Sequence, residues 1–187
     1  MSEEKKIVKK INSKSKGSGF ESTIAKLFTE TFAPIQFRRS QSSGAILGGQ
    51  NQVHLHRFSN DAKTLFIGDI VPTNEADVMR AEDGFKFKFC IECKFYKEAD
   101  TFAALFKNPQ ILTWFNQVRI DSLKIDEKHP LLVFKFNHSP IYIGFNIEAP
   151  STVTRIIQIN DVKFCLMEDA LKDLSWWKIY NDQTAIE

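Results

Sequence analysis

Three polar residues in the middle of the chain have types and spacings that suit metal-dependent hydrolysis. Residues 85–95 read FKFKFCIECKF, and side chains alternate between two faces of a strand. Glu92 and Lys94 therefore share one face, roughly 6–7 Å apart along the strand. Asp69, in the segment FIGDI, lies close to them if that segment is the antiparallel partner strand. Two carboxylates beside an ammonium can hold a divalent metal and an attacking water.

The opposite face of the same strand is apolar and is expected to enter a core. Its members are Phe85, Phe87, Phe89, Ile91, Cys93 and Phe95. The chain has three cysteines, an odd number that does not suggest a disulfide framework. Cys90 and Cys93 form a C-x-x-C, but residues three apart on a strand point to opposite faces. We therefore expect buried or half-buried free thiols and no zinc site.

The pattern G-D-I…I-E-C-K, from Gly68 to Lys94, resembles the PD-(D/E)XK nuclease superfamily, with Gly68 where the family has a variable proline. The resemblance covers roughly residues 16–145. It implies a Mg²⁺ site, with Mn²⁺ able to substitute, in which Asp69 and Glu92 are direct ligands. The backbone carbonyl of Cys93 is the implied third ligand. Lys94 would orient the attacking water or stabilise the negative transition state.

The first sixteen residues are rich in lysine, and we expect a basic, partly disordered arm in which Lys14 and Lys16 can follow DNA phosphates. An amphipathic helix is predicted to follow and to end before Pro34. Its apolar stripe is Phe20, Ile24, Leu27, Phe28 and Phe32. Ser18 is the expected N-cap. Glu21 then falls in the first turn, where it could close a capping box or reach the strand that carries Asp69.

The run KGSGFE, residues 16–21, is similar to the opening of archaeal-type Holliday junction resolvases, where a first-turn glutamate completes the active site. The resemblance implies that Glu21 joins the metal site through water or serves a second metal. It also implies cleavage of branched DNA by a homodimer, in recombination or repair. Two active sites on symmetrically placed strands require a twofold assembly.

Residues 35–39 form the next predicted strand, and a serine-glycine loop follows it. The resolvases similarly have an arginine-bearing strand and such a loop near the scissile phosphate, which makes Arg38, Arg39 and Ser43 candidates for DNA contact. The strand register, which decides which arginine faces the DNA, stays open. Exposed arginines beside an ordinary turn are the alternative.

Two polar insertions, residues 45–64 and 73–84, surround the aspartate segment. The first contains a short predicted strand, 53–56, whose His54 and His56 are expected on the surface or against phosphates. Helices are predicted over 100–107 and 109–124, the second with Asn108 and Pro109 at its start. Many relatives in the superfamily place a glutamine of this helix near the metal, so Gln117 is a candidate catalytic residue. A surface role is the alternative.

The remaining chain predicts strands at 130–136, 141–145 and 155–159, and then a helix from Phe164 to Leu174. Trp176 and Trp177 are expected to pack that helix or to support a dimer contact. The element order predicts an α/β fold. We expect a mixed central β-sheet flanked by helices, a restriction-endonuclease-like core (αβββαβ) with a C-terminal β-α extension, in one domain over residues 17–187.

The composition predicts one domain of ordinary size with no globally basic field. The chain has 187 residues, 43% of them hydrophobic with seventeen phenylalanines, and a net charge of only +2, so DNA binding must depend on local patches. No segment suits a membrane span or a secretory signal, which predicts action in the cytoplasm, or in the host-cell cytoplasm if a phage encodes the chain. Two alternatives stay open: a restriction-type or repair nuclease that acts on duplex DNA, and a non-catalytic nucleic-acid-binding protein.

Overall fold

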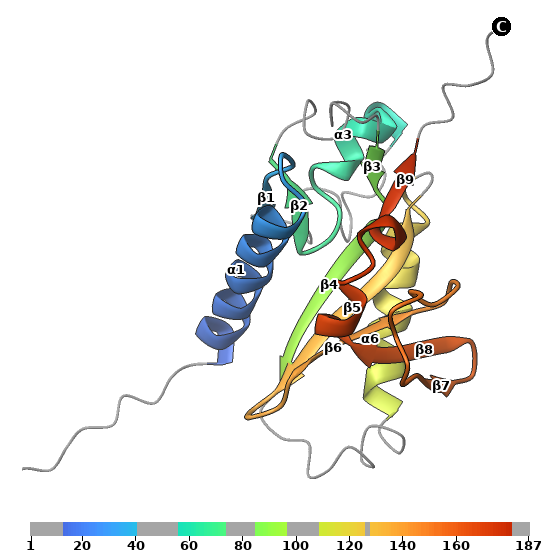
Figure 1. Cartoon of the computed structure of the whole chain (residues 1–187). Helices are drawn as coiled ribbons and strands as arrows, with labels where there is room; N and C mark the ends of the chain where they lie inside the picture. Colours follow the sequence, from blue (N-terminus) through green and yellow to red (C-terminus); the bar gives the residue numbers. More distant parts are fainter. Residues whose placement is uncertain (1–12, 41–55, 74–84, 97–108, 126–127, 181–187) are drawn as a thin grey trace, which may run out of the picture.

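A seven-stranded mixed β-sheet with a helix on each face organises the molecule (Figure 1). The structure is a computed structural model, and it describes residues 13–40, 56–73, 85–96, 109–125 and 128–180. The elements are α1 (Ser13–Thr31), β1 (Phe37–Arg39), α3 (Asn60–Thr64), β2 (Ile70–Pro72), β3 (Phe85–Phe87), β4 (Phe89–Tyr96), α6 (Pro109–Ser122), β5 (His129–Phe136), β6 (Ile141–Phe145), β7 (Ile157–Ile159), β8 (Val162–Leu166), α7 (Met167–Ala170), the 3₁₀ helix η2 (Leu174–Trp177) and β9 (Lys178–Tyr180).

The strand order is β1-β2-β4-β5-β6-β8-β7. Strands β4 and β5 are parallel, and the other neighbouring pairs are antiparallel. Helix α6 makes the crossover between the two parallel strands, as parallel pairing requires. The α/β class and the mixed sheet flanked by helices are therefore confirmed, and the arrangement is consistent with a restriction-endonuclease-like fold.

Helix α1 begins at Ser13, earlier than predicted. Ser18 is therefore not an N-cap: it lies inside the helix, where its carbonyl accepts a hydrogen bond from the Ser22 hydroxyl. Lys16 and Gly17, expected to precede the helix, are also helical, and Glu21 is not in the first turn. The apolar stripe marks only the turns that pack on the sheet, whereas lysine and serine allow the earlier turns at little cost in helix propensity.

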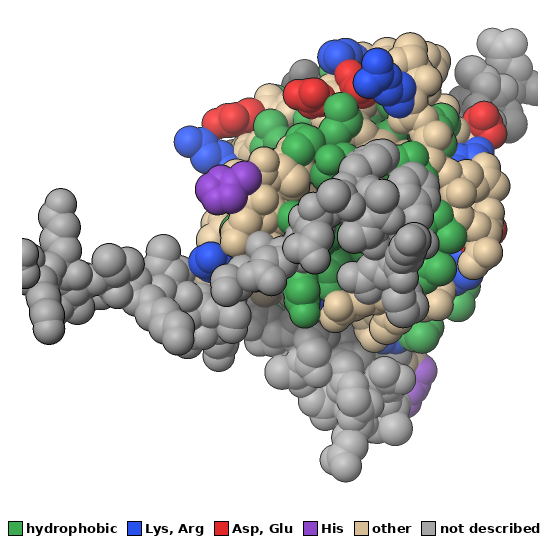
Figure 2. Space-filling view, turned by 90° about the horizontal axis from the view of Figure 1, so that it is seen from below, with side chains coloured by type: hydrophobic (Ala, Val, Ile, Leu, Met, Phe, Trp, Pro, Cys, Tyr) green, Lys and Arg blue, Asp and Glu red, His purple; other side chains and the backbone are tan. Residues whose placement is uncertain are grey.

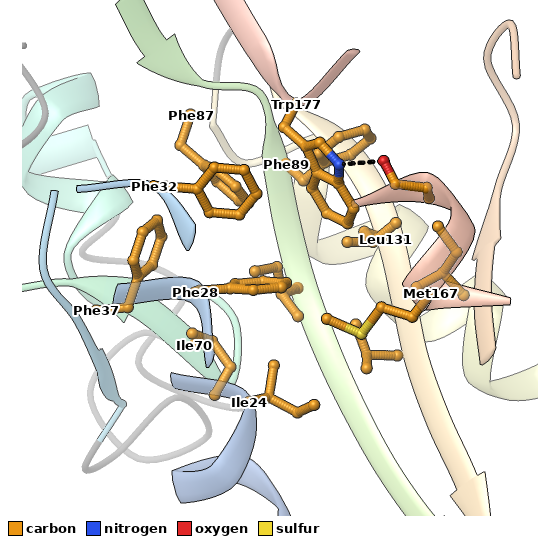
Figure 3. Close-up of a cluster of buried hydrophobic side chains, with 14 of the residues drawn as sticks. Ile24, Phe28, Phe32, Phe37, Ile70, Phe87, Phe89, Leu131, Met167 and Trp177 are labelled. Carbon is orange, nitrogen blue, oxygen red and sulfur yellow. Dashed lines mark hydrogen bonds between the residues drawn. The ribbon is translucent and has the colours of Figure 1, made fainter. Parts of the chain in front are cut away.

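Helix α1 covers one face of β1, β2 and β4. The core between them is rich in aromatic rings (Figure 3). Phe28 lies 5.5 Å from Trp177 and 5.7 Å from Phe37, centroid to centroid, in edge-on arrangements that aromatic quadrupoles favour. This packing joins the helix to both the first strand and the C-terminal segment.

Helix α6 covers the opposite face, on β4 and β5. It ends at Ser122, close to the predicted end, and it buries Ile111, Phe115 and Val118. The two cysteines of β4 separate as predicted: Cys93 enters the core under α1, and Cys90 enters the core under α6. All three cysteines are free and buried, as expected.

The predicted strand over residues 85–95 is interrupted at Lys88. The Lys88 backbone N–H donates to the Trp177 carbonyl (2.9 Å), and β3 leaves the main sheet to pair with β9. Phe87 and Phe89 nevertheless enter the same core, so the predicted alternation holds across the break.

The predicted helix from Phe164 to Leu174 is wrong. Residues 162–166 form strand β8, which joins β7 through a turn in which Asn160 has φ 56°. Helix α7 is only four residues long. Strand β8 is apolar on both faces, and such a run cannot be told from a buried helix by periodicity.

The two tryptophans pack inside the fold. Trp177 is fully buried, and its indole N–H donates to the Ala170 carbonyl of α7 (2.9 Å). Trp176 is 8% exposed and donates to the Glu148 carbonyl (2.6 Å). The expectation that they pack against the last helix is confirmed, and neither indole is available for a dimer contact.

Several predictions lie outside the described residues. These are the arm over residues 1–12, the loop with Ser43, the strand residues 53–55, the insertion from residue 74 to 84 and the helix at 100–107. His56 is exposed and is not in a strand. Among the described helices, none has the length and apolar character needed to cross a membrane.

Candidate active site

Asp69 is held against the middle of strand β4. Antiparallel pairing places Ile70 opposite Ile91, and the Asp69 backbone N–H donates to the Ile91 carbonyl (2.7 Å). The Asp69 carboxylate accepts a hydrogen bond from the Cys93 backbone N–H (2.8 Å). The expected antiparallel neighbour of the Glu92 strand is therefore confirmed, although β2 begins only at Ile70 and the preceding residues form a turn.

Gly68 shapes that turn. It has φ +102°, and a Cβ on it would lie 2.9 Å from the Ile91 carbonyl oxygen. Only glycine takes this conformation and close approach without strain. The glycine at the family's variable proline position is thus explained by the contact between the Asp69 turn and β4.

Ser40 fixes the same turn from the other side, a role that sequence reasoning missed. Its backbone N–H donates to the Asp69 carbonyl (2.8 Å), and its hydroxyl donates to the Phe66 carbonyl (3.2 Å). The only signal in the sequence is its place directly after the arginine strand, which is insufficient to predict these bonds.

Glu92 and Lys94 lie on the α6 side of β4, as the alternation predicted. The Lys94 ammonium forms an ion pair with a Glu92 carboxylate oxygen. The Lys94 side chain is 33% exposed and the Glu92 side chain 12%, so Lys94 does not turn inward among the phenylalanines. In the sheet they pair with Leu132 and Phe134 of β5.

The electrostatics couple these groups. Burial and the neighbouring Glu92 carboxylate raise the pKa of Asp69 to about 7, although the Cys93 N–H and Lys94 oppose the shift. Burial lowers the pKa of Lys94, but the charge and hydrogen bond of Glu92 outweigh it and leave the pKa raised. Lys94 is therefore an ammonium at neutral pH. Asp69 becomes fully ionised at neutral pH only when a further cation stabilises its negative charge.

Glu21 lies on the face of α1 that meets β1. Its Oε2 accepts a hydrogen bond from Nε of Arg39 (2.7 Å). The charge of Glu21 also raises the pKa of Asp69, but by less than burial or the Glu92 carboxylate does. Glu21, Asp69, Glu92 and Lys94 therefore share one electrostatic neighbourhood, which helix α1, strand β4 and the turn before β2 assemble.

The donor set suits a hard divalent cation, although it is not preassembled as a cage. Within the described ranges, no group of three or more His, Cys, Asp or Glu side chains is close enough to hold a metal ion. Two carboxylates whose charges oppose each other nevertheless favour a cation between them. Burial raises the pKa of the Cys93 thiol far above its usual range, so this residue would contribute its carbonyl oxygen and not a thiolate.

The two arginines of β1 point to opposite faces, which resolves the open register. Arg39 faces α1 and Glu21, whereas Arg38 donates to the Leu65 carbonyl (3.4 Å) on the other face. Lys16 lies over the Phe95 ring, 5.9 Å from its centroid, near the end of β4. Lys14 is helical, and Ser43 lies outside the described residues.

The face seen in Figure 2 has hydrophobic side chains toward its centre, and acidic and basic side chains near each other toward its rim. The described side chains on this face do not form a continuous basic stripe. This distribution agrees with the net charge of +2.

Gln117 is exposed on α6, and its amide donates to the Asp121 carboxylate one turn later (3.1 Å). This hydrogen bond joins Gln117 to its own helix. Its catalytic role stays a prediction.

Comparison with known proteins gives one match. The model of the family described as "Phage putative PDDEXK endonuclease" matches residues 12–170, a range that contains Glu21, Asp69, Glu92 and Lys94. No curated protein and no solved structure matches the chain.

Proposed function

The chain belongs to this phage PDDEXK endonuclease family, and from that premise we propose that it is a Mg²⁺-dependent endonuclease that hydrolyses phosphodiester bonds in DNA. The observation that carries the proposal is the meeting of Asp69, Glu92 and Lys94 at one point of the β2–β4 pair. The raised pKa of Asp69 marks a site where acidic groups are held together despite their mutual repulsion. Such sites are typically functional.

We assign Asp69, Glu92 and the Cys93 carbonyl as the residues that hold the metal, with Mn²⁺ able to substitute. When bound, the cation would neutralise charge on the phosphate and lower the pKa of a coordinated water. The Cys93 N–H fixes the orientation of the Asp69 carboxylate, and the Glu92 side chain is only 12% exposed. Lys94, charged and tethered to Glu92, can donate to the attacking water or to a phosphate oxygen.

Branched DNA cleaved by a homodimer is the substrate class and assembly we propose, and Arg39 with the loop after β1 supports it through the resolvase resemblance. A duplex-cutting nuclease of the restriction or repair type is the second candidate. It is favoured by the helical conformation of Lys16 and Gly17, because in the resolvases the corresponding pair precedes the helix. For both candidates, we propose that the protein acts in the cytoplasm, or in the host-cell cytoplasm if a phage encodes the chain.

A gel assay tests the activity and the substrate together. Four-way junctions, flaps and linear duplexes are incubated with Mg²⁺, Mn²⁺ or EDTA, for the wild type and for Asp69→Asn and Glu92→Gln. Asp161→Asn is the control. Asp161 lies on the exposed turn between β7 and β8, and its carboxylate pairs with Arg119 of α6. We expect metal-dependent cleavage that both site variants lose and the control keeps. Cleavage in EDTA, or unchanged cleavage by both site variants, contradicts the proposal.

A further inference from the structure

The Glu21–Arg39 pair connects α1 to the first strand beside the proposed metal site. The distance between Glu21 Oε2 and Arg39 Nε is 2.7 Å, and the side chains are 20% and 42% exposed. Arg39 pairs across the sheet with Ile70, the residue after Asp69. The backbone of Arg39 therefore lies one strand spacing, about 5 Å, from the strand that begins directly after Asp69.

The geometry makes Glu21 a poor member of the metal set. Its Oε2 accepts the hydrogen bond from Arg39, and Glu21 lies on α1, whereas the backbone of Asp69 is hydrogen-bonded directly to the strand that carries Glu92. A carboxylate oxygen that accepts a hydrogen bond from a guanidinium is a weaker ligand for a cation, and the positive charge of the adjacent arginine repels a metal ion. The Glu21–Arg39 ion pair therefore suits a role in which it stays formed better than a role in metal binding.

An arginine held in this way can bind a phosphate. A guanidinium has five N–H donors in a planar fork, and Glu21 engages one of them. Among the described residues, Glu21 is the acidic partner of Arg39, which leaves the other donors for the partly exposed side. Fixing one long side chain before binding also removes part of the entropy cost of association.

We propose that Glu21 is a positioning residue for Arg39 and not a metal ligand: it fixes the guanidinium on β1, the strand beside β2, where it binds a phosphate of the DNA backbone close to the scissile bond. This inference deepens the proposed nuclease function and rests on it. It assigns one acidic residue of the neighbourhood to substrate binding and leaves the metal to Asp69 and Glu92.

The test separates metal binding from DNA binding. Glu21→Ala, Glu21→Gln, Arg39→Gln and the double variant Glu21→Ala/Arg39→Gln are compared with Glu30→Ala. Glu30 also lies on α1 and pairs with Lys26, but both side chains are largely exposed. Titration calorimetry measures the affinity for Mn²⁺ alone. Fluorescence anisotropy measures the affinity for labelled DNA in Ca²⁺ without cleavage, at several salt concentrations, and circular dichroism confirms that each variant is folded.

We expect Glu21→Ala and Arg39→Gln each to weaken DNA binding about three- to tenfold and to lower the salt dependence by about one phosphate contact. The double variant should be no weaker than Arg39→Gln, because both changes remove one interaction. Glu21→Gln keeps an acceptor oxygen and should be intermediate. Mn²⁺ affinity should stay within about twofold, and Glu30→Ala should match the wild type.

Three results would overturn the inference: a loss of Mn²⁺ affinity of about tenfold or more in Glu21→Ala, additive losses in the double variant, or tighter DNA binding by Glu21→Ala. The last is the outcome expected of an acidic group that merely repels phosphate. Asp69→Asn distinguishes this failure from that of the nuclease proposal. If Asp69→Asn loses Mn²⁺ binding and cleavage, the nuclease assignment stands whatever Glu21 does.

Discussion

The Asp69 carboxylate accepts a hydrogen bond from the backbone N–H of Cys93 at 2.8 Å, which ties the acidic group of one strand to the peptide that follows Glu92 on the next. The bond holds two carboxylates together in a partly buried place. Burial and Glu92 raise the pKa of Asp69 more than this bond lowers it. The site is therefore electrostatically unfavourable when both acids are ionised without a cation.

Stability without metal should fall as pH rises toward neutrality. The Asp69 pKa of about 7 in the folded state lies above the ordinary 3.8, so folding favours the protonated form. The contribution to stability is present below about pH 4 and is lost as pH rises through 7. At ~1.4 kcal/mol per pKa unit, it amounts to at most a few kcal/mol.

Urea unfolding in EDTA between pH 5 and 8 measures this effect. Asp69→Asn carries a neutral side chain at every pH, and its free energy of unfolding should fall less over this range than that of the wild type. Divalent metal at pH 8 should stabilise the wild type but not the variant, because the ligand must be deprotonated. Equal pH slopes for the two proteins would contradict the raised pKa.

Lys94→Met should separate binding from hydrolysis. The ammonium is partly exposed and paired with Glu92, and its proposed role is to stabilise charge that develops in the transition state. We expect the cleavage rate to fall about 10²-fold or more. The affinity for DNA should fall by no more than the loss of a single positive charge would cause. Single-turnover cleavage at saturating enzyme measures the rate, and Lys163→Met is the control, because Lys163 pairs with the exposed Glu148. A rate loss explained by weaker binding alone would remove Lys94 from the chemical step.

The C-terminal tryptophan should be essential for stability and not for catalysis. Trp177 is fully buried and contacts Phe28, Phe32 and Phe87 (Figure 3). Trp177→Ala should lower the free energy of unfolding by roughly 3–5 kcal/mol, whereas Leu174→Ala, at a partly exposed position in the same 3₁₀ helix, should lower it far less. Thermal unfolding measures both. A Trp177 variant that keeps wild-type stability would contradict the packing.

The local part of the site could be predicted from the sequence because strand alternation is a strong rule. The period of two placed Glu92 and Lys94 on one face and the phenylalanines on the other, and the structure confirms both. The closeness of Asp69 was predicted only on the condition that its segment pairs antiparallel with the same strand, and the structure meets this condition at Ile70 and Ile91.

Contacts between distant segments could not be predicted in the same way. Which arginine meets Glu21 depends on the register of β1, which a three-residue strand does not encode. The start of α1 was misplaced because its first turns pack little apolar surface. Strand β8 was mistaken for helix because both of its faces are covered, and then local periodicity carries no information.

Gly68 gives the sharpest test of how the backbone positions Asp69. Gly68→Ala must place a Cβ 2.9 Å from the Ile91 carbonyl at φ +102°, and we expect a loss of roughly 1–3 kcal/mol in the free energy of unfolding. Gly19→Ala is the matched control, because Gly19 lies in α1 with no heavy atom within 4 Å of the added Cβ. The control should gain roughly 0.5–1 kcal/mol.

Cleavage should separate the two glycine variants further. If the turn at Gly68 positions Asp69, Gly68→Ala should lose activity under conditions in which it is still fully folded, and Gly19→Ala should not. Urea unfolding and the junction assay with Mg²⁺ measure the two properties on the same samples. Equal stabilities of the two variants would mean that the turn relaxes freely, and then Asp69 would owe its place to the Cys93 hydrogen bond alone.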